Sequence, residues 1–111
     1  MGLFGSSTGA AAALIVAALL PQEVSAVVSR GGRADLAGDY LGKVQAPTLL
    51  IVGSADAEVL RLNEMARDQM TCTANIAVVD GAAHLFAEPG ALEQVQELAS
   101  AWFLRNLSRE S

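Results

Sequence analysis

The stretch Gly5-Ser6-Ser7-Thr8-Gly9, followed by the apolar run at residues 10–20, decides how the rest of the chain can be arranged. A serine with glycines two positions before and after it is typical of a nucleophile elbow, a sharp turn between a strand and a helix. The turn strains the serine backbone, so both flanking positions are expected to be small to avoid a clash. The pattern predicts that the Ser7 hydroxyl stands clear of a sheet, beside the first amides of the helix.

The remaining chain alternates between short apolar runs, which predict strands, and helical segments. The clearest strand is the continuous apolar run at residues 48–52, which indicates a strand covered on both faces. The predicted order is a strand at 2–4, a helix at 10–20, a strand at 24–29, an irregular segment at 30–47 with a helical turn or two at 35–41, a strand at 48–52, a helix at 59–70, a strand at 75–79 and a helix at about 89–107.

The predicted helices differ in the faces that they are expected to bury. The first is apolar on every side, so we expect it to lie between layers. Arg105 and Arg109 suit the negative end of the dipole of the last helix. The other two are amphipathic, and their expected buried residues are Val59, Leu62, Met65, Ala66 and Met70 in one, and Leu92, Val95, Leu98, Ala99 and Trp102 in the other.

This alternation predicts an α/β fold, with a mostly parallel sheet of the doubly wound kind and helices on its faces. In such sheets, reactive groups gather at the carboxyl ends of the strands. Four chemically capable side chains each follow a predicted strand, namely Ser7, Arg30, Asp56 and His84. The sequence therefore predicts that they meet at one edge of the sheet.

Composition indicates a single domain over residues 1–111 and excludes several classes of function. Apolar residues make up 52% of the chain, and the net charge of −5 with 5% aromatic residues argues against nucleic-acid binding. Cys72 is the only cysteine, which excludes an intrachain disulfide and suits a reducing, cytoplasmic location. With one histidine, one cysteine, no P-loop and no G-x-G-x-x-G, we expect no metal, nucleotide or other cofactor.

The amino-terminal segment allows two other interpretations. Residues 1–26 resemble a secretory signal peptide, and residues 1–6 fit the loose myristoylation pattern. However, no lysine or arginine precedes Arg30, and the apolar run is shorter than the ~20 residues that span a bilayer. Either interpretation would remove Ser7 from a catalytic role, and we expect no membrane association.

Three segments resemble the nucleophile, acid and histidine motifs of the α/β-hydrolase superfamily, in that order along the chain. They are Gly5-Ser6-Ser7-Thr8-Gly9, Gly53-Ser54-Ala55-Asp56-Ala57-Glu58-Val59 and Gly81-Ala82-Ala83-His84-Leu85-Phe86. The resemblance is strongest to the dienelactone-hydrolase branch and its serine-bearing relatives, and it covers the carboxyl-terminal half of their fold, from the fifth strand onward. Dienelactone hydrolases of this type carry a cysteine where Ser7 stands.

The resemblance implies a serine hydrolase acting on carboxylic esters, lactones or thioesters through an acyl-enzyme. His84 would accept the proton of Ser7, Asp56 would orient the imidazole, and the Thr8 amide would stabilise the oxyanion. Each residue also has a structural alternative. Ser7 and Asp56 can cap helices, and His84 can be structural. Arg30 and Arg33 can hold an acidic substrate group or pair with Asp35 or Asp39.

The half of the fold that the resemblance does not cover carries the second oxyanion amide. Its absence leaves the strand at residues 2–4 with an open edge that invites pairing with another chain. We therefore expect a homo-oligomer, most simply a two-fold dimer, acting on a small-molecule ester. The alternative function is a catalytically weak or inactive hydrolase fragment that serves as an association or small-anion-binding module.

Overall fold

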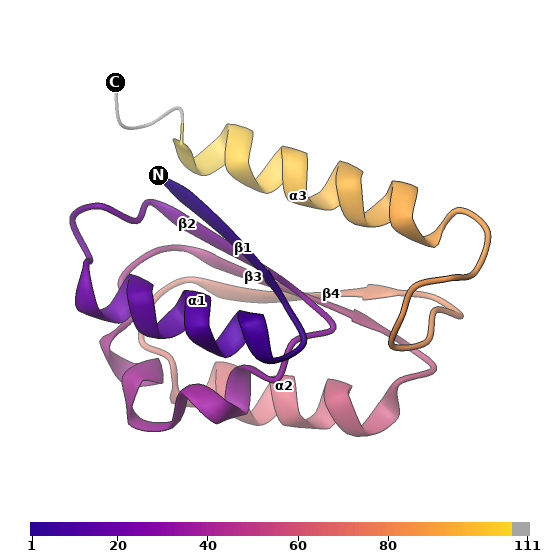
Figure 1. Ribbon diagram of the computed structural model, residues 1–111, viewed down its shortest axis with the longest axis horizontal. Coiled ribbons are helices and arrows are strands. Elements are labelled where there is room, and N and C mark those ends of the chain that lie inside the picture. Colours follow the sequence, from indigo (N-terminus) through magenta and orange to yellow (C-terminus); the bar gives the residue numbers. More distant parts are fainter. Residues whose placement is uncertain (108–111) are drawn as a thin grey trace.

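The computed structural model describes residues 1–107 and consists of one parallel sheet with helices on both faces (Figure 1). The strands pair in the order β1-β2-β3-β4. The predicted α/β fold class is therefore confirmed. In chain order, the elements are β1 (Gly2–Ser6), α1 (Thr8–Leu19), β2 (Ala26–Arg30), the 3-10 segment η1 (Ala34–Lys43), β3 (Thr48–Gly53), α2 (Ala57–Gln69), β4 (Ala74–Val79) and α3 (Ala91–Leu107).

The helices divide unequally between the two faces of the sheet. In Figure 1, α1 and α2 lie below the strands and α3 lies above them. Residues of α1, η1 and α2 share one buried cluster, whereas α3 belongs to another. Because the strands follow one another across the sheet, the reversal of strand order that a doubly wound sheet requires does not occur within the described residues.

The last helix begins later than the sequence predicts. Gly90 has a φ of +83°, which is incompatible with a right-handed helix, so α3 starts after it and Pro89 lies in the preceding turn. Arg105 lies in the last turn of α3, as expected. Arg109 is outside the described residues.

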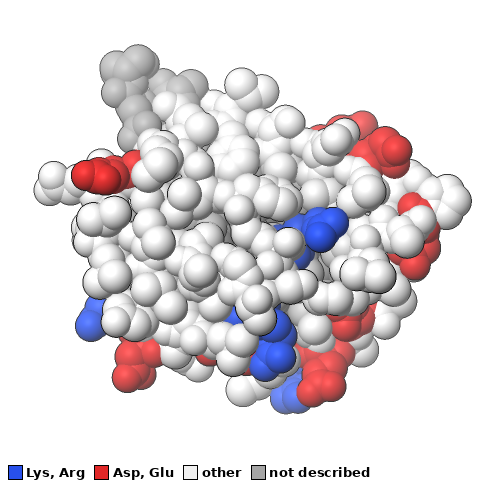
Figure 2. Space-filling view, viewed as in Figure 1, with Lys and Arg blue, Asp and Glu red and all other residues white. Residues whose placement is uncertain are grey.

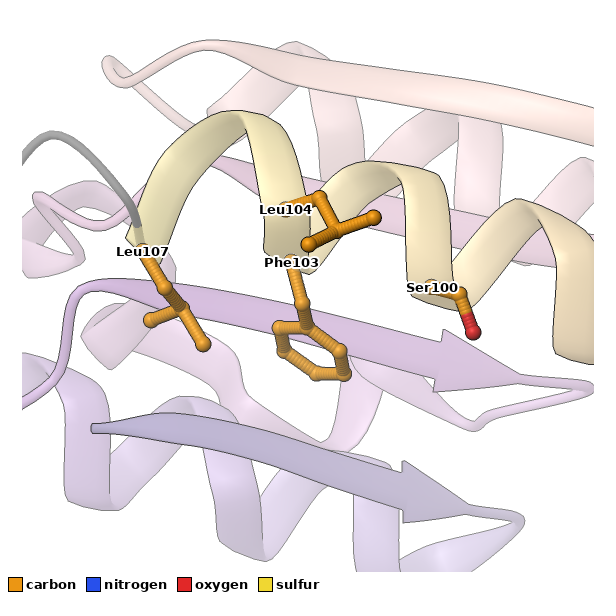
Figure 3. Close-up of a pocket in the computed structure, with 4 residues that line it drawn as sticks. All are labelled: Ser100, Phe103, Leu104 and Leu107. Atoms are coloured by element: carbon orange, nitrogen blue, oxygen red, sulfur yellow. The ribbon is translucent and has the colours of Figure 1, made fainter.

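Strand β1 forms an open edge of the sheet, because it pairs with β2 alone. The side of the molecule that carries β1 and α1 has a broad uncharged area, with most charged side chains toward its rim (Figure 2). Phe4 of β1 is half exposed. Beside it, the end of α3 carries an apolar groove lined by Ser100, Phe103, Leu104 and Leu107 (Figure 3).

Helix α1 was expected to be buried on every side, and this is wrong. Leu14 and Ala17 are completely buried, but Val16, Leu19 and Leu20 are 38–61% exposed. The exposed residues lie on the side of α1 that no described element covers. No helix within residues 1–107 combines the length and the apolar character needed to cross a bilayer.

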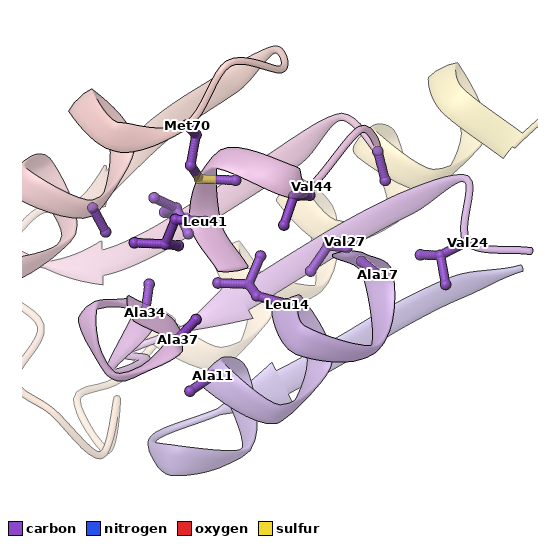
Figure 4. Packing of buried hydrophobic residues seen from close by; sticks show 13 residues of the cluster. Ala11, Leu14, Ala17, Val24, Val27, Ala34, Ala37, Leu41, Val44 and Met70 are labelled. Carbon is purple, nitrogen blue, oxygen red and sulfur yellow. The ribbon is translucent and has the colours of Figure 1, made fainter. Parts of the chain in front are cut away.

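Two buried clusters hold the layers together, one on each face of the sheet. On the face of α1 and α2, Leu14, Val27, Leu41 and Val44 are essentially inaccessible to solvent (Figure 4). On the opposite face, α3 buries Val95, Ala99 and Trp102 against alternate residues of the strands. The Trp102 indole Nε1–H donates a 3.1 Å hydrogen bond to the Pro47 carbonyl, which satisfies the one polar atom of that side chain.

The buried face of α2 differs from the predicted stripe. Met65 is 48% exposed, whereas Asn63 is completely buried together with Ala66 and Met70. At 100° per residue, Met65 lies on the opposite side of the helix from Asn63, so both cannot face the sheet. In α3, Leu92 of the predicted stripe is 47% exposed.

Candidate active site

Ser7 lies between the end of β1 and the start of α1, in the turn that the sequence predicts. Its φ of 49° and ψ of −125° are strained values for a residue with a side chain. A Cβ on Gly5 would approach the Gly9 carbonyl oxygen to 2.5 Å and Ala10 to 2.8 Å, so the turn requires glycine there. The matching expectation for Gly9 is wrong, since a Cβ at that position would meet nothing within 4 Å.

Asp56 is positioned by the turn between β3 and α2. Its backbone N–H donates to the Gly53 carbonyl, and its own carbonyl accepts from Leu60 in the first turn of α2. A Cβ on Gly53 would overlap the Ala82 carbonyl, so this turn packs directly against the loop after β4. The Ala55 N–H donates to the same Ala82 carbonyl at 3.0 Å. The two loops that carry the acid and the histidine are therefore joined through their backbones.

His84 lies in the loop between β4 and α3, against the loop that follows β2. Gly31 has a φ of +54°, and a Cβ built on it would lie 3.2 Å from the Phe86 ring and 3.4 Å from His84 Nδ1, so this loop packs directly against the His84 segment. Phe86 is buried at a φ of +55°, a genuine outlier for an aromatic residue. Backbone strain of this kind clusters at functional sites.

The three predicted side chains form a hydrogen-bonded series across the carboxyl edge of the sheet. Ser7 Oγ lies 3.0 Å from His84 Nε2, and His84 Nδ1 lies 2.9 Å from Asp56 Oδ2. Because an ionised carboxylate only accepts hydrogen bonds, the Nδ1–H donates to Asp56. Nε2 is then the acceptor for the Ser7 hydroxyl proton in the neutral imidazole.

The structural alternatives for the serine and the acid do not match this geometry. Ser7 and Asp56 are the N-cap residues of α1 and α2, but neither side chain makes a capping hydrogen bond. Both side chains are directed to His84 instead. The Asp56 side chain is 18% exposed and that of His84 is 40% exposed, so the series is open to small molecules at the imidazole.

Thr8 and Arg30 were predicted to serve the same site. Thr8 is the first residue of α1, where amides point out of the helix without an intrahelical partner. Arg30 ends β2 opposite Ser6, and its guanidinium lies 5.6 Å from the centre of the Phe86 ring. Its Nε is buried without a hydrogen-bond partner. Among residues 1–107, no ion pair of Arg30 with Asp35 or Asp39 is found.

Arg33, by contrast, pairs with Asp35, as the structural alternative for it predicted. The guanidinium donates from Nε and Nη2 to the two carboxylate oxygens, at 3.1 and 3.0 Å. These hydrogen bonds hold the pKa of the Asp35 carboxyl below its usual value. Burial raises the pKa of the half-buried Cys72 thiol. Within the described part of the chain, no three His, Cys, Asp or Glu side chains are arranged to hold a metal ion.

Two residues near the site were missed by the sequence analysis. Phe86 packs against Gly31 and Arg30, and Asn63 reaches the loop after β2 from the buried face of α2. The signal for Asn63 was present, because it lies four residues after Val59 and three before Ala66, on the apolar stripe. For Phe86 the sequence carries no comparable signal, since its contacts come from other strands.

The fold is the one that α/β-hydrolases share. No family model matches the chain. Solved structures do, and the predicted resemblance to dienelactone-hydrolase-like enzymes is confirmed by one of them. A dienelactone hydrolase from Anabaena variabilis is 52% identical, with a TM-score of 0.93 over 95% of this chain and 49% of its own.

More distant structures share the fold. The esterase domain of a Rhodothermus marinus protein has a TM-score of 0.83 at 22% identity, over 95% of this chain and 61% of that one. A predicted CIB-like hydrolase from Thermoplasma acidophilum has a TM-score of 0.73 at 21% identity, over 92% of this chain and 49% of that one.

Curated relatives carry a different name. Two Mycobacterium tuberculosis proteins, from strains CDC 1551 and H37Rv, are provisionally named phosphoribosyl transferases and are 58% identical over 107 residues. The match covers 96% of this chain but only 24% of each relative. The chain thus spans about a quarter of these relatives and about half of the dienelactone hydrolase.

Proposed function

We propose that the chain hydrolyses carboxylic esters through Ser7, His84 and Asp56. The observation that carries this proposal is the pair of contacts at His84, 3.0 Å to the serine hydroxyl and 2.9 Å to the carboxylate. Nucleophile, base and orienting acid are recognised by this geometry rather than by spacing in sequence. The similarity to a dienelactone hydrolase supports the same class of reaction.

The proposed reaction proceeds in two halves. Ser7 Oγ attacks the ester carbonyl carbon while His84 Nε2 accepts the hydroxyl proton, and the imidazolium is stabilised by Asp56. The bond to the leaving alkoxide breaks as the imidazolium returns the proton to it. Water, deprotonated by His84, then attacks the acyl-enzyme and releases the carboxylic acid. The Thr8 amide is the proposed oxyanion donor in both halves.

A fluorophosphonate probe tests this assignment directly. An activated serine attacks phosphorus and expels fluoride, so the wild-type chain should gain one phosphonyl group on Ser7, located by peptide mass spectrometry. Ser7→Ala should abolish labelling. Ser6→Ala removes the adjacent hydroxyl and is the matched control, expected to label as wild type does. Ester hydrolysis should follow the same pattern.

Two outcomes would contradict the proposal. Labelling that survives Ser7→Ala would assign the nucleophile elsewhere. A folded wild-type chain that neither labels nor hydrolyses esters would favour the association or anion-binding module instead.

We also propose that Arg30 binds an acidic group of the substrate. Its guanidinium lies over the Phe86 ring beside the site and forms no ion pair with a carboxylate of the described residues. Arg30→Met should lower kcat/KM for a hemiglutarate ester by about 10- to 150-fold, since a charge-assisted hydrogen bond contributes ~1.5–3 kcal/mol. The matched neutral valerate ester should be unaffected, and an equal loss on both esters would remove Arg30 from this role.

Finally, we propose that the chain forms a two-fold dimer through β1. An edge strand is self-complementary, because antiparallel pairing with a second copy satisfies the same backbone groups on both chains. Residues 1–22 contain no charged side chain, so two copies would bring no like side-chain charges together here. Phe103 and Leu107 point from α3 toward the strands (Figure 3) and would extend the apolar contact.

A further inference from the structure

Asn63 is a completely buried polar residue in the middle of α2. Its side-chain Nδ2 donates hydrogen bonds to the carbonyl oxygens of Val59, at 2.8 Å, and of Gly32, at 2.9 Å. Both partners are acceptors, which fixes the orientation of the amide, because its oxygen could not face them. The bond to Val59 stays within the helix, and the bond to Gly32 crosses to the loop after β2.

A single peptide group, between Gly32 and Arg33, links the Asn63 side chain to the backbone of Ser7, the candidate nucleophile. The Gly32 carbonyl and the Arg33 N–H belong to the same planar trans peptide and point in opposite directions. At its other end, the Arg33 N–H donates to the Ser7 carbonyl at 2.9 Å. A rotation of this peptide plane therefore displaces both hydrogen-bonding groups together.

The Ser7 backbone needs such support. Its strained backbone conformation, with a φ of 49° and a ψ of −125°, is one that persists only when surrounding contacts hold it. Two N–H groups reach its carbonyl, from Arg33 at 2.9 Å and from Ala10 at 3.2 Å. Only the first comes from outside the elbow itself.

The loop that carries this peptide is tightly packed. A Cβ on Gly32 would overlap Ser29 Oγ and the Ala10 side chain, so the loop has no room to adopt another path close to the elbow. Helix α2 begins directly after Asp56, the partner of His84. One rigid helix therefore carries the acid at its start and Asn63 two turns further on.

We infer that Asn63 is a positioning residue for Ser7, acting through the Gly32–Arg33 peptide. Its role in catalysis rests on the proposed function, whereas the hydrogen-bonded link can be measured without it. By restraining the Ser7 backbone, Asn63 keeps the Ser7 hydroxyl within hydrogen-bonding distance of His84.

Asn63→Leu tests the inference, because leucine keeps the branched shape of the side chain and removes both N–H donors. We expect fluorophosphonate labelling of Ser7 and kcat for ester hydrolysis to fall about 10-fold or more, with KM unchanged. Amide hydrogen exchange at Arg33 should accelerate to a similar degree. The matched control is Ala66→Gly, which destabilises the same helix one turn later without changing a residue that contacts Gly32. Each variant is measured at the same number of degrees below its own Tm.

The outcomes separate this inference from the proposed function. If Asn63→Leu does not fold, Asn63→Ser, which also lacks the amide, is measured in the same way. Slower labelling with faster Arg33 exchange, absent from the control, supports the link. Unchanged exchange at Arg33, or an equal loss of labelling in Ala66→Gly, overturns it. If wild type does not label at all, the proposed function fails and Arg33 exchange alone decides the link.

Discussion

Two residues of the candidate site occupy positions where their side chains ordinarily cap helices. Ser7 and Asp56 precede α1 and α2, and their residue types are among the preferred N-caps. Neither side chain caps, and both contact His84. The helices forgo a capping bond that commonly contributes ~1 kcal/mol each. Such a departure from local preference is expected where residues are used for chemistry.

The two glycines of the elbow should respond differently to substitution. Gly5→Ala places a Cβ 2.5 Å from the Gly9 carbonyl oxygen and should cost ~1–3 kcal/mol of unfolding free energy, with loss of Ser7 labelling. Gly9→Ala enters open space in the first turn of α1 and should be neutral or stabilising by up to about 1 kcal/mol. Urea denaturation and probe labelling of both variants would check this, and equal losses would contradict it.

The Asp35 carboxylate should give the chain a small pH-dependent stability. Its pKa is lowered in the folded state by hydrogen bonds from Arg33, so the stabilisation is fully present above the unfolded pKa of about 3.9. It is lost as the pH falls through the folded pKa. Asp35→Asn should lower Tm by only a few degrees at pH 7, since the pair is near the surface. The difference from wild type should shrink below pH 4 in thermal scans, and a constant difference would contradict it.

At the scale of elements, burial rather than composition distinguishes the two sides of α1. The helix is built almost entirely from alanine, leucine, isoleucine and valine, yet only the side that faces the sheet and η1 is buried. When a helix is apolar on all sides, its sequence therefore does not indicate which of its residues are buried and stabilise the fold.

Leucine substitutions on the two sides of α1 should separate these contributions. Leu14→Ala removes a completely buried side chain and should lower the unfolding free energy by ~2–5 kcal/mol through lost burial and a residual cavity. Leu19→Ala truncates a side chain that is 61% exposed and should change it by less than ~0.5 kcal/mol. Chemical denaturation at low protein concentration is the measurement. A large loss for Leu19→Ala would show that this side of α1 is covered in solution.

At the scale of the whole molecule, the open edge of β1 leaves backbone hydrogen-bonding groups without a partner strand. The sheet ends there without a covering helix or loop among residues 1–107, and apolar side chains of β1, α1 and α3 are exposed around it. Natural sheets protect such edges with charge, proline or a covering element. None of these is present in β1.

Phe4→Lys is therefore the substitution that should dissociate the proposed dimer. Phe4 is half exposed, and a lysine there puts a positive charge from each chain at the shared edge. Sedimentation velocity at micromolar concentration should show a dimer for wild type and a monomer for the variant. Glu93→Lys, which also introduces a lysine but in the first turn of α3, is the control and should remain dimeric. A folded wild-type monomer would exclude the dimer.

The sequence by itself determined the features that depend on local spacing. Gly5 before Ser7 indicated the elbow, and continuous apolar runs indicated strands such as β3, because backbone sterics and side-chain periodicity act over a few residues. The serine, acid and histidine motifs occur in the order that α/β-hydrolases use, and each was predicted to follow a strand. The α/β fold class was predictable in this way, although the doubly wound strand order was not observed. Ser7, Asp56 and His84, which form the hydrogen-bonded series, were predictable as well.

Only the tertiary structure decided which side chains meet. Ser7 and His84 are 77 positions apart and His84 and Asp56 are 28 apart, and their contacts depend on the register of parallel strands that local sequence does not encode. The same holds for Asn63, whose side-chain amide donates a hydrogen bond to the Gly32 carbonyl, 31 positions away. Spacing can place a residue at an edge or on a face, but a hydrogen bond requires positions within a few tenths of an ångström, which only packing of the whole chain supplies.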